Sequence, residues 1–446
     1  AADIKGDLSG VSRMGKAQDW QTRRAAEIGF TDFADDVYPV IFWDLFGKQG
    51  HPVRATISEM GPVLLSRILD LNDTQEGVLN IAFRVADEEG LLLLDLKDLR
   101  ALLVEVQERA REISARYGNV TTASIGAIQC ALLVLEQQGA DHFFGERALV
   151  IKDLMRTDAD GRGVVSILAA DQLMQSPRLY ATFLLWLLSE LFEELPEVGD
   201  PDKPRLVFFF DEAHLLFDDA PKALVDKVEQ VVKLIRSKGV GVYFVTQNPV
   251  DIPESVLAQL ANRIQHALRA YTPREQKAVL VAAQTFRPNP AFSTEEAITQ
   301  LGIGEALVSV LEAKGVPSMV GRTFIRPPSA QVGPISPAER DAALANSPVG
   351  ALYDTVLDRE SAFEVLNKRA REKQLAEERA ALEAQRLEEA EQLAKERARA
   401  EKAAAPRRST RQSPTEAAMT SFARTVANTL GRELVRGILG GLKGRR

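Results

Sequence analysis

The stretch Arg205-Leu206-Val207-Phe208-Phe209-Phe210-Asp211-Glu212 decides the fold, because five apolar residues end abruptly in two acids. Such a run predicts a strand of a parallel sheet that is buried on both faces. Ligands of open α/β sheets bind at the carboxyl ends of the strands, so Asp211 and Glu212 should face that crevice. In nucleotide hydrolysis the first acid of a Walker B pair holds Mg²⁺ through its water shell, and the second orients or deprotonates the attacking water. The alternative is that the two acids only begin a loop or cap the next helix.

A second apolar run, Val240 to Val245, ends in Thr246-Gln247-Asn248. Together with Val164 to Leu168, these runs alternate with helical stretches, which predicts a parallel sheet with right-handed crossovers. Gln247 or Asn248 would emerge at the same sheet edge as Asp211, placed to sense a γ-phosphate or to position water. The alternative is an amide that is satisfied by the turn backbone.

The remaining segments complete an α/β fold class: a mostly parallel sheet with an inserted helical subdomain and a long C-terminal helix. Residues 1–50 begin the core with a strand at Tyr38 to Trp43, residues 51–145 form the helical insertion, and residues 146–335 complete the core. Residues 336–405 contain a linker and a Glu-, Ala- and Arg-rich helix from about Arg359 to Ala405. Its leucines keep no heptad, so a coiled-coil partner and a solvated helix both remain open.

Composition narrows the class of protein. The chain has 446 residues, 45% hydrophobic and 26% charged, with a net charge of −8. Four histidines and the single Cys130 exclude a disulfide framework and a cysteine-based zinc module, so a reducing, cytoplasmic location is expected. No apolar run reaches the ~20 residues that span a bilayer. Cys130, Trp43, Phe183 and Trp186 lie in apolar periodic runs and are predicted to belong to the core.

The last segment, residues 406–446, differs in charge from the body. It carries nine Lys or Arg residues against Glu416 and Glu433, a net charge of +7 that leaves −15 for the rest. We expect a basic, partly amphipathic helix that contacts DNA phosphates, an anionic membrane surface or an acidic neighbouring subunit. A loosely ordered tail that aids solubility is the alternative.

Four motifs carry a family resemblance: Asp3-Ile4-Lys5-Gly6-Asp7-Leu8, Phe210-Asp211-Glu212-Ala213-His214, Ile235 to Val240, and Val245 to Pro249. They resemble the HerA/FtsK class of P-loop ATPases, and the chain to about residue 370 looks like the bacterial YjgR-like group within it. The resemblance implies a RecA-like core that uses ATP and Mg²⁺. It also implies a homo-oligomeric, hexameric ring and a role as a DNA translocase or helicase.

The same resemblance implies roles for individual residues. Asp211 would be the acid associated with Mg²⁺ through water, Glu212 the catalytic glutamate and Gln247 the polar sensor, while Asp3 and Lys5 would belong to the nucleotide-binding residues. Arg236 would reach the nucleotide of a neighbouring subunit, where a guanidinium stabilises charge on phosphoryl oxygens. The alternative for Arg236 is ordinary compensation of a helix dipole. Arg263 and Arg269 are weaker rivals for its role.

One family element is missing from the sequence. The phosphate-binding motif G-x-x-x-x-G-K-[ST] does not occur in the sequence. The most similar stretch, Gly315 to Thr323, has the wrong spacing and no lysine. Either this loop is lost, or a strand, loop and helix of about 30 residues or more precede Ala1. We expect the second, and weak or no ATPase activity for these 446 residues alone. The alternative function is a non-catalytic scaffold or membrane-surface adaptor built on an ATPase fold.

Overall fold

The computed structural model describes residues 1–16, 18–199, 201–217, 220–312 and 315–404. The chain divides into two units, Ala1–Ala370 and Arg371–Arg446. The predicted basic tail at residues 406–446 lies outside the described residues.

Two parallel sheets form the α/β part of the first unit. The larger one has the order β1 (Ala2–Asp3), β4 (Val165–Ala169), β2 (Val40–Asp44) and β3 (His51–Pro52). The smaller one pairs β5 (Leu206–Phe210) with β6 (Val240–Phe244) in register, so that Phe210 lies opposite Phe244. The prediction of an α/β fold with parallel strands at these positions is confirmed.

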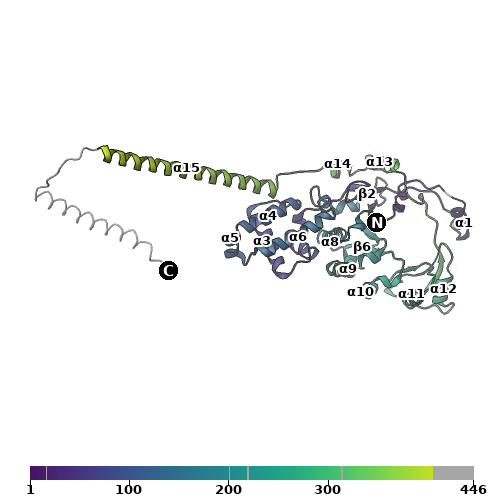
Figure 1. Ribbon diagram of the computed structural model, residues 1–446. Helices are drawn as coiled ribbons and strands as arrows, with labels where there is room; N and C mark the ends of the chain where they lie inside the picture. Colours follow the sequence, from purple (N-terminus) through teal and green to yellow (C-terminus); the bar gives the residue numbers. More distant parts are fainter. Residues whose placement is uncertain (17, 200, 218–219, 313–314, 405–446) are drawn as a thin grey trace, which may run out of the picture. The chain divides into compact units, whose positions relative to one another are not determined.

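A helical subdomain lies between β3 and β4 in sequence, as predicted. It consists of α2 (Ile57–Ile68), α3 (Asp73–Glu89), α4 (Leu96–Glu108), α5 (Ala110–Tyr117), α6 (Thr122–Gln137) and α7 (Ala140–Phe143). Figure 1 shows α3 to α6 gathered together. Four of these helices begin at a polar cap whose side chain accepts a backbone N–H of the first turn: Thr56, Asn72, Asp95 and Thr121.

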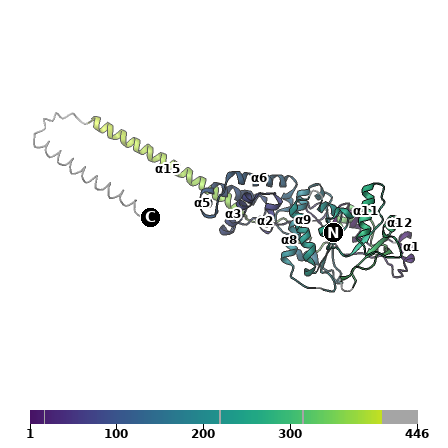
Figure 2. The ribbon, with the colours of Figure 1, turned by 90° about the horizontal axis from the view of Figure 1, so that it is seen from below.

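Helices α8 (Pro177–Glu194) and α9 (Lys222–Leu234) join the β5–β6 sheet to the core, and they lie side by side in both views (Figures 1 and 2). Trp43, Phe183 and Trp186 are buried, as predicted. Cys130 is exposed on α6, so its prediction as a core residue is wrong.

One face of the β5–β6 sheet is uncovered. Phe208 and Phe210 point toward the core, whereas Phe209, Tyr243 and Val245 are 44%, 50% and 48% exposed. The expectation of burial on both faces is therefore wrong for β5, because the described chain supplies packing on one side of this sheet only.

A third, antiparallel sheet was not predicted. It has the order β7 (Arg263–Gln265), β8 (Glu305–Ser309), β9 (Gly321–Phe324), and it packs with α11 (Pro273–Gln284) and α12 (Thr294–Gln300) around a small core of its own. The other helices of the first unit are α1 (Asp19–Glu27), α10 (Glu254–Leu257), α13 (Pro337–Ala345) and α14 (Gly350–Tyr353).

The predicted long helix is α15 (Ala362–Ala404), which begins within the first unit. In the second unit its leucines Leu375, Leu382, Leu387 and Leu393 are each more than half exposed. Over the described residues, no single helix has the length and apolar character of a membrane span; α5 and α6 meet the criterion together, as a pair bent by 101°.

Glu190 on α8 makes the stability of the fold sensitive to pH. Burial, followed by the charges of Glu59, Glu194 and Glu193, raises the pKa of Glu190 to about 7. The unfolded value is ~4.3, so the folded state binds the extra proton, and its stability falls as pH rises from about 4.3 to 7. Because Glu190 is half-buried, solvent screening limits the effect.

We therefore expect Glu190→Gln to raise the melting temperature at pH 8 by roughly 1–2 °C and to change it little at pH 5. Differential scanning calorimetry at the two pH values measures this. The exposed Glu108→Gln is the control and should leave both temperatures unchanged. An equal shift for Glu190→Gln at both pH values would contradict the raised pKa.

Candidate active site

Polar side chains from three strand ends meet at one carboxylate. The Lys5 Nζ atom, just after β1, lies 3.3 Å from Glu212 Oε1. The Gln247 amide nitrogen, just after β6, donates to Glu212 Oε1 at 2.9 Å and to Oε2 at 3.1 Å. Figure 1 shows the amino terminus beside this small sheet. We call Lys5, Asp211, Glu212 and Gln247 the strand-end site.

Backbone hydrogen bonds at the ends of β5 and β6 fix the position of Glu212. The Val245 N–H donates to the Phe210 carbonyl, and the Ala213 N–H donates to the Val245 carbonyl. Between them, Glu212 adopts a left-handed conformation with φ 47° and ψ 50°. A non-glycine residue in this region costs on the order of 1–3 kcal/mol and persists only where its surroundings hold it. Its side chain is 12% exposed, so the strand ends turn this carboxylate into the site.

The surroundings of Glu212 favour its ionised form. Burial pushes the pKa of Glu212 upward, but the hydrogen bond from Gln247 and the ion pair with Lys5 outweigh burial, and the net shift is downward. His214, in the short 3-10 helix Ala213–Leu216, places its Nδ1 atom 3.5 Å from Glu212 Oε2. Glu212 is therefore an ionised carboxylate at neutral pH.

Asp3 shapes the turn that carries Lys5. Its two carboxylate oxygens accept the N–H groups of Gly6 at 2.8 Å and Leu8 at 3.1 Å, and the residue is 5% exposed. Gly6 has φ 78°, a conformation that favours glycine. A nucleotide contact of Asp3 stays a prediction, whereas its contacts within the protein are those of a turn-forming residue.

Asp211 lies next to Glu212, and its carboxylate makes no hydrogen bond or ion pair with the described residues. Burial, together with the Asp211 charge, raises the pKa of the buried Tyr180 on α8, so this charge lies near α8. No cluster of three or more acidic, His or Cys ligands exists among the described residues. One carboxylate suits Mg²⁺, which usually keeps several waters and takes further oxygens from substrate phosphates.

Arg236 lies at the opposite end of β6 from Gln247, in the 3-10 turn Ile235–Lys238. The five residues of β6 separate the two by roughly 17 Å, so Arg236 and Glu212 are not brought together within one chain. Its side chain is exposed. The other two arginines donate to backbone carbonyls. Arg263 donates to the carbonyls of Leu257 and Leu260. Arg269 donates to the carbonyls of Thr299 and Leu301.

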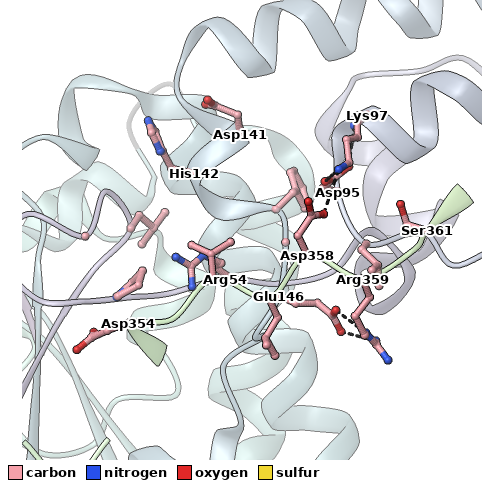
Figure 3. Close-up of a pocket in the computed structure, with 18 of the residues that line it drawn as sticks. Arg54, Asp95, Lys97, Asp141, His142, Glu146, Asp354, Asp358, Arg359 and Ser361 are labelled. Atoms are coloured by element: carbon pink, nitrogen blue, oxygen red, sulfur yellow. Dashed lines mark hydrogen bonds and ion pairs between the residues drawn. The ribbon is translucent and has the colours of Figure 1, made fainter. Parts of the chain in front are cut away.

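A cavity of about 630 Å³ lies elsewhere, where residues 354–361 pass the loops at 45–54 and 141–146 (Figure 3). Its charged residues largely pair with one another. Arg359 binds both oxygens of Glu146, and Lys97 contacts Asp358 at 3.3 Å. The lining also contains Asp95, Asp141 and Asp354 against Arg54. This excess of acids disfavours a triphosphate, so the strand-end site is the better nucleotide candidate.

Two contacts of the strand-end site were not predicted: His214 with Glu212, and Lys5 with Glu212. Both follow from the strand ends: a residue two positions after Glu212 turns back toward it, and the end of β1 meets the end of β5.

A parallel strand pair with an acidic strand end and a facing amide is compatible with an α/β protein that binds its ligand at the carboxyl ends of the strands. The chain belongs to the helicase HerA-like C-terminal family, whose model matches residues 1–446. This match confirms the resemblance to HerA/FtsK ATPases; the narrower YjgR-like assignment stays a prediction.

Individual relatives are distant. "Probable helicase MJECL08" from Methanocaldococcus jannaschii is 31% identical over 125 residues, which are 27% of this chain and 22% of that protein. The chain thus matches about a fifth of its relative's length. Among solved structures, the bacterial conjugative coupling protein TrwBdeltaN70 has a TM-score of 0.41 at 13% identity, covering 66% of this chain and 82% of that one. VirB4 of Thermoanaerobacter pseudethanolicus has a TM-score of 0.40 at 16% identity, and the match covers 67% of this chain and 78% of that one.

Proposed function

We propose that this chain is the ATP-hydrolysing core of a DNA translocase or helicase-like motor. The observation that carries the proposal is the ionised Glu212 carboxylate at the carboxyl ends of β1, β5 and β6. Lys5 and Gln247 hold this carboxylate, and Asp211 is the preceding residue. Membership of the helicase HerA-like family supports the assignment as an ATPase. The net positive charge of residues 406–446 supports a polyanion such as DNA as the binding partner. We place the motor in the cytoplasm, the reducing compartment expected for a chain with one cysteine.

Each residue of the strand-end site has a proposed task. Glu212 accepts the proton of the attacking water, and Gln247 orients that water or the carboxylate. Asp211 would hold Mg²⁺ through water, and the bound ion would neutralise charge on the phosphate oxygens. Lys5, with 62% of its side chain exposed, would offer its ammonium to a phosphate in place of Glu212.

We propose a homo-oligomeric ring, hexameric by family resemblance, because the exposed Arg236 lies too far from Glu212 of its own chain to share its nucleotide. A guanidinium from the neighbouring subunit would stabilise the phosphoryl oxygens there. A membrane-surface contact of the basic tail remains an alternative use of residues 406–446.

The test is ATP hydrolysis by the protein joined to the family's phosphate-binding loop, measured with and without duplex DNA. We expect turnover that DNA stimulates, and weak or no turnover by the 446 residues alone, because they contain no lysine-bearing glycine loop. Removal of residues 406–446 should flatten the salt dependence of DNA binding, since nine basic residues are lost. ATP-independent membrane or subunit binding without any turnover would favour the scaffold instead.

A further inference from the structure

A short sequence repeat lies within α15, the long helix of Figure 2. The block Leu375-Ala376-Glu377-Glu378-Arg379-Ala380-Ala381-Leu382 is followed 18 residues later by Leu393-Ala394-Lys395-Glu396-Arg397-Ala398-Arg399-Ala400. Both blocks have the form L-A-x-E-R-A-x-[LA]. At about 3.6 residues per turn, 18 residues complete five turns of an α-helix, so the two blocks present the same side chains on the same face.

The apolar positions of the two blocks form one line along this face. We call Leu375, Leu382, Leu393 and Ala400 the α15 stripe. Their spacings of 7, 11 and 7 residues are close to two, three and two turns, so the line runs along the helix axis although it keeps no heptad. All four residues are exposed, and the three leucines are each more than half exposed. Such a line on an otherwise polar helix buries its side chains only against another element.

The charged residues beside the α15 stripe are sorted by sign. At about 100° per residue, they lie roughly 30–50° from the stripe, with acids on one side and arginines on the other. The acids are Glu378, Glu389 and Glu396, and the arginines are Arg379, Arg386 and Arg397.

The charges beside the stripe differ from those on the opposite face of the helix. Glu378 accepts an amide hydrogen bond from Gln374, but none of the six charges forms an ion pair with a described side chain. On the opposite face, Lys395 pairs with Glu391 at 3.2 Å within the helix. The charges beside the stripe are therefore available to a partner.

We propose that α15 pairs in parallel and in register with α15 of a second copy of this chain, stripe against stripe. Parallel pairing sets the acidic side of one helix against the arginine side of the other, so that Glu378 faces the partner's Arg379 and Glu396 faces the partner's Arg397. Antiparallel pairing would set acids against acids and arginines against arginines, which is repulsive. This self-complementarity favours a second copy as the occupant, and the inference does not depend on ATP hydrolysis.

Disulfide cross-linking of the full chain tests the pairing. Because Cys130 is exposed, all variants carry Cys130→Ser. We expect Leu382→Cys chains to form a disulfide-linked dimer under mild oxidation, and Ala384→Cys chains, whose cysteine lies on the opposite face, to stay monomeric on a non-reducing gel. In a mixture of Leu375→Cys and Leu393→Cys chains, one of them tagged, only like chains should cross-link. Cross-links between unlike chains, or equal cross-linking through Ala384→Cys, would overturn the proposal.

A charge exchange tests the role of the flanking residues. Glu378→Arg with Glu396→Arg puts arginines on both sides of the stripe, and we expect it to slow cross-linking through Leu382→Cys roughly tenfold, since four interhelical ion pairs are lost. Adding Arg379→Glu and Arg397→Glu exchanges the two sides and should restore the rate, while circular dichroism confirms that the helix is kept. An unchanged rate in the first variant, or no recovery in the second, would contradict parallel pairing.

Discussion

Replacement of Glu212 by glutamine is expected to lower ATP turnover by about 10²-fold or more in the chain joined to the family's phosphate-binding loop, because a general base contributes ~10²–10⁴-fold. The amide keeps the size of the side chain and its hydrogen bond with Gln247, but it cannot accept a proton. ATP affinity should change little, since Asp211 and Lys5 remain. Turnover and fluorescent-nucleotide binding measure the two effects separately.

Glu254→Gln is the matched control for this substitution. Glu254 is an exposed acid at the start of α10, which follows β6 and the turn with Gln247. The Glu254→Gln variant should hydrolyse ATP at the rate of the wild-type protein. DNA-stimulated hydrolysis that survives Glu212→Gln would remove the assignment of Glu212 as the base, even if the family assignment stands.

The second large effect concerns stability. Asp98 on α4 is fully buried, and both oxygens of its carboxylate accept hydrogen bonds. The N–H groups of Leu94 and Asp95 donate to Oδ2 at 2.8 and 3.1 Å, and the Phe363 N–H donates to Oδ1 at 2.9 Å. The Ser361 hydroxyl lies 2.5 Å from Oδ1 and shares its proton between Asp98 and Glu364. This one side chain therefore caps α4 and anchors the first turn of α15.

We expect Asp98→Ala to lower the free energy of unfolding by about 3 kcal/mol, because three backbone N–H groups lose their acceptor at a buried position. Urea denaturation measures the loss, and hydrogen exchange should show faster opening of Ala362 to Ala370. Asp98→Asn, which keeps one acceptor oxygen, should cost less, and the exposed Asp87→Ala should cost under ~0.5 kcal/mol. An equal loss for the Ala variants of Asp98 and Asp87 would contradict the anchoring role.

The strands and the meeting of Glu212 with Gln247 were predictable because they depend on local pattern. Apolar runs such as Leu206 to Phe210 mark strands, and parallel strands bring their carboxyl ends to one edge. The exposure of Phe209 and Cys130 was not predictable in the same way, because periodicity does not tell what the rest of the chain places against a given face. Strands β7 and β9, of 3 and 4 residues, are too short for a pattern of alternation, and β8 has polar residues at both ends, Glu305 and Ser309.

The contact between Lys5 and Glu212 joins residues that are 207 positions apart. Its prediction requires the lateral order of the strands, which the pattern of apolar residues does not contain. The motif around Asp3 and Lys5 supplied the residues, but the turn that Asp3 builds with the N–H groups of Gly6 and Leu8 decides where Lys5 points.

The central claim is that nucleotide hydrolysis takes place at the joint carboxyl ends of β1, β5 and β6. A structure of the chain joined to the family's phosphate-binding loop, with a non-hydrolysable ATP analogue and Mg²⁺, tests this claim most directly. We predict the γ-phosphate beside Glu212 and Gln247, with Lys5 moved from the carboxylate to a phosphate oxygen. An analogue bound away from Glu212, for instance in the cavity lined by Arg54 and Asp354, would contradict the claim.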